Sequence, residues 1–242
     1  MEDATKYLII DMTLHIIASE VESMERKRSI YLAIVTMIGL FWFWGLSMHV
    51  GTPPVLQLIW FNPDTTSYMR NDPNPEIKHE WRPLSKISPY LKRAVVEAED
   101  DLFYEHQGFD WEAMKRAAEY NLKKKRFARG ASTITMQVAR NLFLTPDKSL
   151  LRKFRELLIA LKLERELSKD RILEIYLNVV EWGNGIYGAE AAARHYFGKN
   201  ATNLTPYEAA YLASILPKPK FYDRHRGSGF PKRRATSIMS RI

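Results

Sequence analysis

The feature that most constrains this chain is a long stretch, Ser29–Pro63, that contains no Asp, Glu, Lys or Arg. Its most apolar part covers residues 29–48. A helix of about 20 apolar residues rises about 30 Å, which matches the hydrocarbon core of a bilayer. Basic residues occupy positions 26–28, and the next one beyond the stretch is Arg70. The positive-inside rule therefore predicts one transmembrane helix over residues 29–48, with residues 1–28 in the cytoplasm and the rest of the chain outside it.

Two other interpretations of this stretch stay open. One is a helix buried in a protein core. The other is a cleaved signal peptide, which fits less well because the apolar run is long and no small-residue cleavage site closes it. Met24 opens a short basic segment, MERKRS, of the kind that often precedes a membrane helix, so it is a candidate alternative start of translation.

Composition narrows the function classes. The chain has no cysteine, which excludes a disulfide scaffold, a zinc–thiolate site and a cysteine nucleophile. Its net charge is +8 and its pI is about 9.5, which favours an anionic partner. Nucleic acid, membrane phosphate and a phosphorylated substrate all satisfy that charge. The excess of basic residues is concentrated in two regions, Ala113–Arg165 and Ile215–Ile242.

Two regions follow the apolar stretch. Residues 49–85 are rich in proline, so we expect a linker with one short strand at Val55–Phe61. Helix signals dominate residues 86–242. We expect helices that are capped at Ser88, at Asp110 (ending at about Asn121) and at Ser132 (residues 133–142). A further helix is expected to begin at Thr205, which forms a capping box with Glu208, and to end at Pro217 and Pro219. The outer domain is therefore predicted to be all-α.

The predicted helix over residues 150–167 is apolar on two opposite faces, which is typical of a helix that runs through a core. Arg152 and Glu156 lie one turn apart on the second of these faces. On a solvated helix such a pair contributes only tenths of a kcal/mol. Because this face is apolar, we expect the pair to be partly buried, and buried charge usually has a functional or structural reason.

Several familiar patterns are not informative here. Gly183–Gly188 matches GxGxxG, but the preceding residues have a helical pattern where a dinucleotide fingerprint needs a strand. We expect these glycines to end one helix and begin the next. His106 and His195 lack the spacing of metal ligands, so no metal site is assigned. The SxxK nucleophile pattern of penicillin-binding enzymes does not occur in the sequence.

The segment Glu99–Gly108, EDDLFYEHQG, is more informative. It places carboxylates beside Phe103 and Tyr104 where a helix is expected to end. Desolvation beside aromatic rings raises the pKa of a carboxyl group and makes it a better base. Composition alone favours ordinary surface acids at these positions.

This segment resembles the first motif, EDxxFxxHxG, of the glycosyltransferase domain of peptidoglycan synthases. Four further segments resemble the remaining motifs of that domain in the same order. They are Gly130–Asn141 (GxSTIxQQxxKN), Arg152–Glu156 (RKxxE), Arg171–Asn178 followed in the sequence by Tyr196–Lys199, and Leu212–Pro219. With one membrane helix and no transpeptidase domain, the chain is most similar to the monofunctional biosynthetic peptidoglycan transglycosylases, glycosyltransferase family 51.

The resemblance implies an all-α (mainly helical), lysozyme-like glycosyltransferase domain, residues 86–242, preceded by a single transmembrane helix. It implies polymerisation of lipid II into glycan strands, with inversion at the donor anomeric carbon and release of undecaprenyl pyrophosphate. Its partners are then lipid II, the growing glycan strand, the membrane and other cell-wall synthesis proteins. The implied location is the bacterial inner membrane, with the catalytic domain on the periplasmic face.

The resemblance also implies roles for individual residues. Glu99 corresponds to the general base, and Glu156 to a second catalytic carboxylate that orients the donor site. The implied substrate contacts are Asp100, Phe103, His106, Ser132, Thr133, Gln137, Arg140, Lys148, Arg152, Lys153 and Arg155. Arg152 is the best single candidate for the pyrophosphate, because it shares a helix face with Glu156. The helix start after Ser132 also offers unpaired N–H groups to an anion.

No cofactor is required by the sequence, although a Mg²⁺ or Mn²⁺ ion at the pyrophosphate is an option. Two positions depart from the family motifs. Arg140 replaces a Lys and keeps its charge, so phosphate binding is expected to survive. Met136 replaces a Gln, so one amide contact is expected to be lost.

Three rival functions remain. A lytic enzyme that cleaves the same glycan shares the fold and a catalytic Glu, but needs no basic cluster because its substrate has no pyrophosphate. An inactive membrane-anchored scaffold has Met136 as its only support. A nucleic-acid binder fits the pI, but neither the expected orientation nor any motif supports it.

Overall fold

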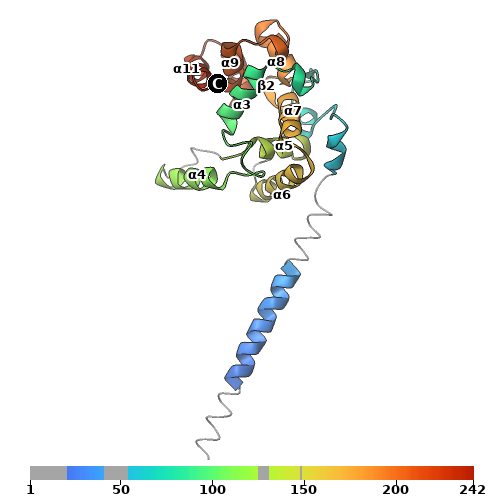
Figure 1. Cartoon of the computed structure of the whole chain (residues 1–242), viewed down its shortest axis with the longest axis vertical. Helices are drawn as coiled ribbons and strands as arrows, with labels where there is room; N and C mark the ends of the chain where they lie inside the picture. Colours follow the sequence, from blue (N-terminus) through green and yellow to red (C-terminus); the bar gives the residue numbers. More distant parts are fainter. Residues whose placement is uncertain (1–20, 41–53, 125–130, 148) are drawn as a thin grey trace, which may run out of the picture. The chain divides into compact units, whose positions relative to one another are not determined.

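The computed structural model describes residues 21–40, 54–124, 131–147 and 149–242. The chain divides into two compact units, Met1–Thr52 and Pro53–Ile242. The first contributes a helix over residues 21–40, drawn in blue in Figure 1. Within the ranges that the structure describes, no helix combines the length and the apolar character needed to cross a membrane. Residues 41–48 of the predicted span lie outside the described residues.

The second unit is mainly helical, which confirms the predicted fold class. Its helices are α2 (Ser67–Arg70), α3 (Pro89–Glu99), α4 (Trp111–Lys124), α5 (Ile134–Phe143), α6 (Leu150–Glu166), α7 (Lys169–Val179), α8 (Ala189–Phe197), α9 (Pro206–Ile215), α10 (Pro219–Arg224) and α11 (Gly229–Met239), with 3-10 turns η1 (Leu56–Ile59), η2 (Leu84–Lys86) and η3 (Ala201–Asn203). One small sheet, absent from the prediction, joins β1 (Lys78–His79), β3 (Ile186–Tyr187) and β2 (Glu181–Gly183) in that order. Strand β3 pairs parallel with β1 and antiparallel with β2.

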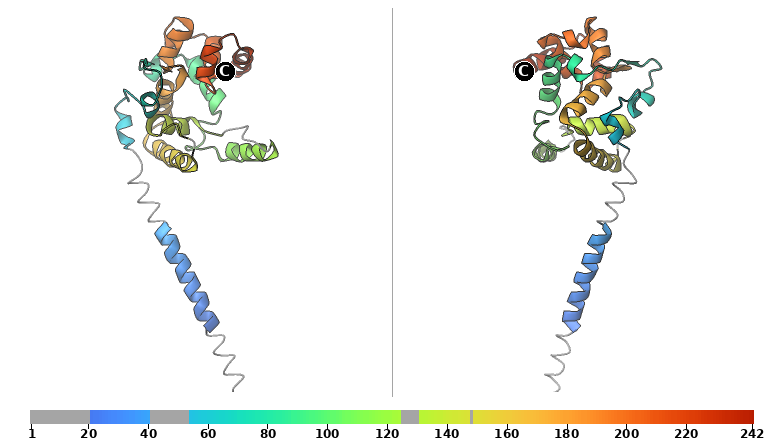
Figure 2. Two further views of the ribbon diagram at one scale, coloured as in Figure 1. Left: turned by 180° about the vertical axis from the view of Figure 1, so that it is seen from behind. Right: turned by 45° about the vertical axis from the view of Figure 1, so that its right-hand side comes forward.

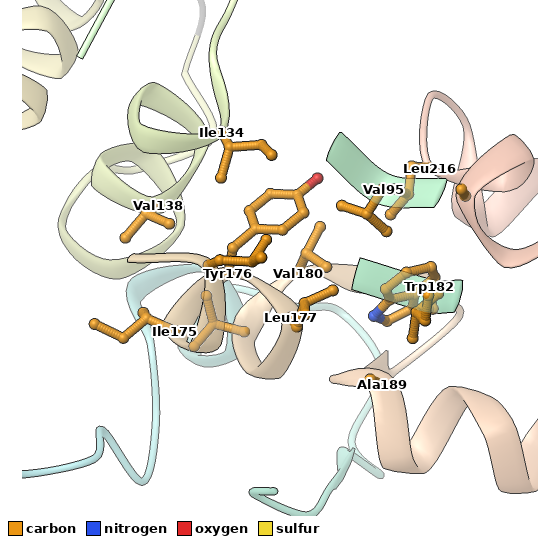
Figure 3. Close-up of a cluster of buried hydrophobic side chains, with 14 of the residues drawn as sticks. Val95, Ile134, Val138, Ile175, Tyr176, Leu177, Val180, Trp182, Ala189 and Leu216 are labelled. Carbon is orange, nitrogen blue, oxygen red and sulfur yellow. The ribbon is translucent and has the colours of Figure 1, made fainter. Parts of the chain in front are cut away.

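Helix α7 connects the two ends of this unit. Helices α5 and α6 lie at one end and α8, α9 and α11 at the other, with α7 between them (Figure 1). In the left view of Figure 2, α4 projects from the rest of the unit. The core around α7 contains the fully buried rings of Tyr176 and Trp182. Figure 3 shows the Tyr176 ring beside Ile134 of α5 and the Trp182 ring near Leu216, with Val95 of α3 between the two.

The helix starts show which local signals are decisive. Helix α9 begins at Pro206 with the predicted capping box between Thr205 and Glu208, so this prediction is confirmed. Helix α4 begins where expected, and Asp110 accepts a hydrogen bond of 2.8 Å from Ala113 N, although the helix continues to Lys124. Helix α3 begins at Pro89 as predicted.

Ser88 is the N-cap residue of α3 as predicted, whereas the predicted cap at Ser132 is wrong, and in both cases a tertiary contact uses the side chain. The Ser88 hydroxyl donates to Leu204 O at 3.1 Å and makes no cap hydrogen bond. At α5 the N-cap is Thr133, whose Oγ1 accepts from Met136 N, so the helix begins one residue later than predicted. Ser132 instead accepts a hydrogen bond from Lys153 Nζ at 2.7 Å.

Most of the expected linker belongs to the folded domain. The compact unit begins at Pro53, and Val55 and Leu58 are buried in the core. The predicted strand at Val55–Phe61 is wrong, because the 3-10 turn η1 lies there. Carbonyl oxygens of this segment accept hydrogen bonds from a side chain and not from a neighbouring strand, because Arg171 donates to Leu58 O at 2.8 Å and to Phe61 O at 3.0 Å.

The glycines of the GxGxxG match lie in a β-hairpin. Helix α7 ends at Val179 and Gly188 is the N-cap of α8, as the prediction requires, but β2 and β3 separate the two helices. Gly188 has φ +84° and ψ 155°, a conformation that is essentially restricted to glycine. A Cβ atom there would lie 2.7 Å from the carbonyl oxygen of Asn178. Glycine is therefore required at this turn.

We predict that Gly188→Ala lowers the free energy of unfolding by about 3 kcal/mol, because it combines backbone strain with a clash against backbone. Gly198→Ala is the matched control. Gly198 also has a positive φ, but no heavy atom of a described residue lies within 4 Å of a Cβ there, so we expect a loss of about 1 kcal/mol. Urea unfolding measures both, and equal losses would contradict the role assigned to the Asn178 contact.

Candidate active site

Glu99, the last residue of α3, carries a carboxylate that reaches two other helices. Gln137 Nε2 of α5 donates a hydrogen bond of 3.1 Å to Glu99 Oε2. Arg234 Nη2 of α11 lies 3.5 Å from Glu99 Oε1. The Glu99 side chain is 14% exposed, so it is mostly desolvated while one edge stays accessible.

The surroundings of Glu99 favour a basic carboxylate. Burial raises the pKa of the Glu99 carboxyl above its ordinary value. The hydrogen bond from Gln137 and the charges of Arg234 and Arg140 lower that pKa, but by less than burial raises it. The prediction of a desolvated carboxyl with a raised pKa at this motif is confirmed for Glu99.

Tyr176 of α7 fixes the orientation of the Gln137 amide. Its hydroxyl donates to Gln137 Oε1 at 3.2 Å, which leaves Gln137 Nε2 to face Glu99. Burial raises the pKa of the Tyr176 hydroxyl well above its ordinary value, so it stays a proton donor. Figure 3 shows its hydroxyl oxygen between Ile134 and Val95. The sequence placed Tyr176 in the fourth motif without assigning it to the site.

Asp100 joins the end of α3 to the start of α5. Its carboxylate accepts a hydrogen bond of 2.9 Å from Ile134 N and lies 2.8 Å from His106 Nε2. Thr133 strengthens the same junction, because its hydroxyl donates to Gly108 O at 2.7 Å. These contacts hold the first and second motifs together. Asp100 also takes the anion position expected at this helix start, which corrects the prediction of unpaired N–H groups there.

Phe103 belongs to the loop between Asp100 and Gly108, and its ring points into the protein. Its side chain is fully buried, and Lys169 Nζ lies 4.6 Å from the centre of its ring. Lys169 also donates to His106 O at 2.6 Å. In this structure the contacts of Phe103 are therefore inside the protein, where they support the loop that ends in Gly108.

A second carboxylate, Glu156 of α6, is fully buried between two cations. Arg152 Nη1 lies 2.6 Å from Glu156 Oε2, and Lys153 Nζ lies 2.5 Å from Glu156 Oε1. The predicted burial of the Arg152–Glu156 pair is confirmed. Two cations and one anion leave the trio with a net positive charge, and mutual pairing offsets the cost of burying them.

One cavity lies beside Glu99, and none of the three residues of the trio is among its lining. It has a volume of about 260 Å³, and its lining includes Glu99, Asp100, Ser132 and Thr133. Ser132 accepts the hydrogen bond from Lys153, so the cation cluster borders the cavity through that hydroxyl. The sequence assigned these residues to one site from motifs far apart in the chain.

The other predicted cations occupy different surroundings. The Arg140 guanidinium carbon lies 5.8 Å from the centre of the Tyr68 ring, and its charge reaches Glu99. Arg155 is exposed and forms no ion pair with another described residue. Lys148 lies outside the described residues. Arg234 is a contact of Glu99 that the sequence did not single out, although the basic run at 232–234 contains it.

Met136 occupies the core and not the cavity lining. It is 1% exposed and belongs to the main hydrophobic cluster. The neighbouring Gln137 supplies the amide that contacts Glu99. The missing amide at position 136 therefore leaves the surroundings of Glu99 intact.

Metal binding is not indicated by side-chain clustering in the described ranges. They contain no group of three or more His, Cys, Asp or Glu side chains arranged to hold a metal ion. The option of Mg²⁺ or Mn²⁺ at a pyrophosphate stays a prediction.

Comparison with known proteins agrees with these motifs. A family model described as Transglycosylase matches residues 67–242. A biosynthetic peptidoglycan transglycosylase of Dechloromonas aromatica is 46% identical over 89% of this chain and 95% of its own length. Proteins of the same name from Aromatoleum aromaticum (48% identical over 82% of this chain and 87% of their own) and an Azoarcus species (52% over 71% and 79%) are also similar. The chain belongs to the transglycosylase family.

Proposed function

We propose that this chain polymerises lipid II into the glycan strands of peptidoglycan, for bacterial cell-wall synthesis. The 4-hydroxyl of the acceptor sugar attacks C1 of the donor sugar, the C1–O bond to the pyrophosphate breaks, and C1 inverts. Two observations carry this proposal: a desolvated carboxylate at Glu99, and a net-positive cluster around Glu156 whose Lys153 donates to Ser132, a residue that lines the Glu99 cavity. The first feature suits a weak hydroxyl nucleophile and the second a pyrophosphate leaving group.

Glu99 acts as the general base. A sugar hydroxyl is a weak nucleophile, so removal of its proton in the transition state accelerates attack by about 10²–10⁴-fold. A carboxyl whose pKa is raised by burial accepts that proton more readily than an exposed one. Gln137 holds one oxygen of Glu99, and the cavity gives the acceptor access to the carboxylate.

Arg152 and Lys153 stabilise the negative charge that develops on the leaving pyrophosphate. Preorganised donors aimed at developing charge are among the largest contributions to catalysis. Glu156 holds both cations and keeps their side chains ordered before the substrate binds. Ser132 positions Lys153 at the cavity, and Arg140 adds positive charge near the base.

Asp100, His106, Thr133 and Phe103 position the loop between the first two motifs. Their hydrogen bonds and ring contacts are made within the protein. We assign them to maintaining the distance between Glu99 and the start of α5. Ser132, Gln137 and the cations are then the groups that face the reaction.

Membrane attachment fits the same substrate. Lipid II carries its polyprenyl tail in the bilayer, so an enzyme confined to that surface meets its substrate at a higher effective concentration. We propose that residues 29–48 anchor the chain in the inner membrane, with the amino terminus inside and the catalytic unit on the periplasmic face. The support is the charge-free stretch and the basic residues that precede it.

Replacing Glu99 tests the base. Glu99→Gln keeps the shape and the hydrogen-bonding edge but cannot accept a proton, so we predict a loss of polymerisation rate of about 10²–10⁴-fold. The assay follows labelled lipid II on a glycan gel with detergent-solubilised protein. Glu97→Gln is the control, since Glu97 lines the same cavity but pairs with Arg241, and should retain most activity. Comparable rates for the two variants would refute Glu99 as the base.

Two arginines of α6 provide a matched test of the leaving-group site. Arg152→Gln removes a cation held against Glu156, and we predict a fall in kcat/KM of about 10²-fold. Arg155→Gln removes the same charge from the exposed face of the same helix and should change kcat/KM by less than about threefold, because exposed charges are well screened. Equal losses would show that only the overall charge of α6 matters.

Fractionation tests the anchor. The full chain should stay in the membrane pellet after an alkaline carbonate wash, because about 20 apolar residues provide enough burial for stable insertion. A version that begins at Pro53, the first residue of the compact second unit, should be released by the same wash. Release of the full chain would refute the transmembrane prediction and favour the buried-helix alternative.

A further inference from the structure

Arg234 on α11 reaches three acceptors at once. Its Nη2 lies 3.0 Å from Ala98 O and 3.5 Å from Glu99 Oε1, and its Nη1 lies 3.3 Å from Ser214 O. These acceptors belong to α3 and α9. One guanidinium therefore ties the last turn of α3 to the end of α9 and contacts the carboxylate that we propose as the base.

The packing of α11 directs the Arg234 side chain towards Glu99. Helix α11 packs against α9 and α3, with Ala235 and Ile238 buried in the core. Because Arg234 adjoins this buried face, its side chain points towards α3. Arg233, the preceding residue, is exposed. The two arginines carry the same charge on one helix, but only Arg234 contacts Glu99.

We propose that Arg234 is a positioning residue, which holds a positive charge beside Glu99 and orients its carboxylate to accept the proton of the acceptor hydroxyl. This inference rests on the proposed function. Arg234 lies 3.5 Å from Oε1 of Glu99 and Gln137 donates to Oε2, so each carboxylate oxygen has a neighbouring donor group. Each carboxylate oxygen has a second lone pair, which stays available to the acceptor.

Arg234 differs from the other charges around Glu99. Arg140 and Gln137 approach from α5, the Tyr176 hydroxyl approaches from α7, and Asp100 is adjacent in the chain. The other charged residues that line the cavity are Glu97, Asp101, Asp110 and Arg116. Arg116 lies 3.8 Å from Asp110, and Glu97 forms an ion pair with Arg241.

Of these groups, Arg140 is the one that the family resemblance implies as a substrate contact, so its charge would be shared with bound pyrophosphate. Arg234 is held instead by two carbonyl oxygens of the protein, so its charge stays beside Glu99 when the donor binds. Burial raises the pKa of Glu99 and Arg234 lowers it. Loss of Arg234 therefore raises this pKa further, and the base becomes protonated at a higher pH.

The test is the pH dependence of kcat/KM for lipid II polymerisation by the full-length chain in detergent. An opposite charge within about 4–6 Å typically lowers a carboxyl pKa by about 1–3 units. Because this contact is long and partly exposed, we expect Arg234→Gln to move the acidic limb of the pH profile of kcat/KM to a higher pH by about 1 unit. The variant should lose rate about tenfold below the limb and much less at alkaline pH. Arg233→Gln should leave the limb in place.

Each outcome has a separate meaning. A wild-type chain that makes no glycan refutes the proposed function itself. An active chain whose limb is the same in Arg234→Gln and the wild type overturns the positioning role, as does an equal shift in Arg233→Gln. If Arg234→Gln does not fold by circular dichroism, Arg234→Met, with a side chain of similar reach and no charge, is measured instead at a temperature where it is folded, with the same expected shift.

Discussion

The hydrogen bond from Ile134 N to the Asp100 carboxylate is the contact on which the site depends. It joins the first residue of α5 to the residue that follows α3. Glu99 lies one position before Asp100, and Gln137 lies about one helical turn after Ile134, so this bond helps to set the distance between the Glu99 carboxylate and the Gln137 amide. A carboxylate at a helix start is also favoured by the helix dipole. The junction is therefore stable without substrate.

The two carboxylates that we propose for the active site, Glu99 and Glu156, lie in contrasting surroundings. Glu156 is fully buried and has a cation within 2.6 Å of each oxygen, so its role is to hold those cations in place. Glu99 keeps an accessible edge and is contacted by one amide and, at longer range, one guanidinium. Two carboxyl groups in different environments differ in how readily they accept a proton, and can therefore take different chemical roles. Here one carboxylate arranges positive charge and the other is free to accept a proton.

Local sequence signals predicted the parts of the fold that depend on local contacts. The capping box at Thr205 and the paired charges of Arg152 and Glu156 are separated by three or four residues, so the helical repeat alone determines them. The motif resemblance placed Glu99 and Gln137 in one site, and the structure brings them into contact.

The features that the sequence missed depend on contacts between distant residues. Ser132 was expected to cap α5, but a lysine from α6 binds its hydroxyl. The 3-10 turn η1 replaces a strand because Arg171, far along the chain, donates to its carbonyls. Arg234 lies in a basic run that has the pattern of a solvated surface, and only the packing of α11 on α3 selects it. None of these contacts has a periodic signature.

The arrangement of charge also distinguishes polymerisation from cleavage. A hydrolase of the same glycan must protonate a sugar oxygen as it leaves, which requires a carboxyl group that stays protonated. Gln137 donates to one oxygen of Glu99 and Arg234 lies 3.5 Å from the other. The two arginines lower the pKa of Glu99, but burial raises it by more, which suits a group that accepts a proton during the reaction. The remaining positive charge lies around Glu156, beyond Ser132. A proton-accepting carboxylate on one side and cations on the other suit a hydroxyl that loses a proton and a pyrophosphate that needs none.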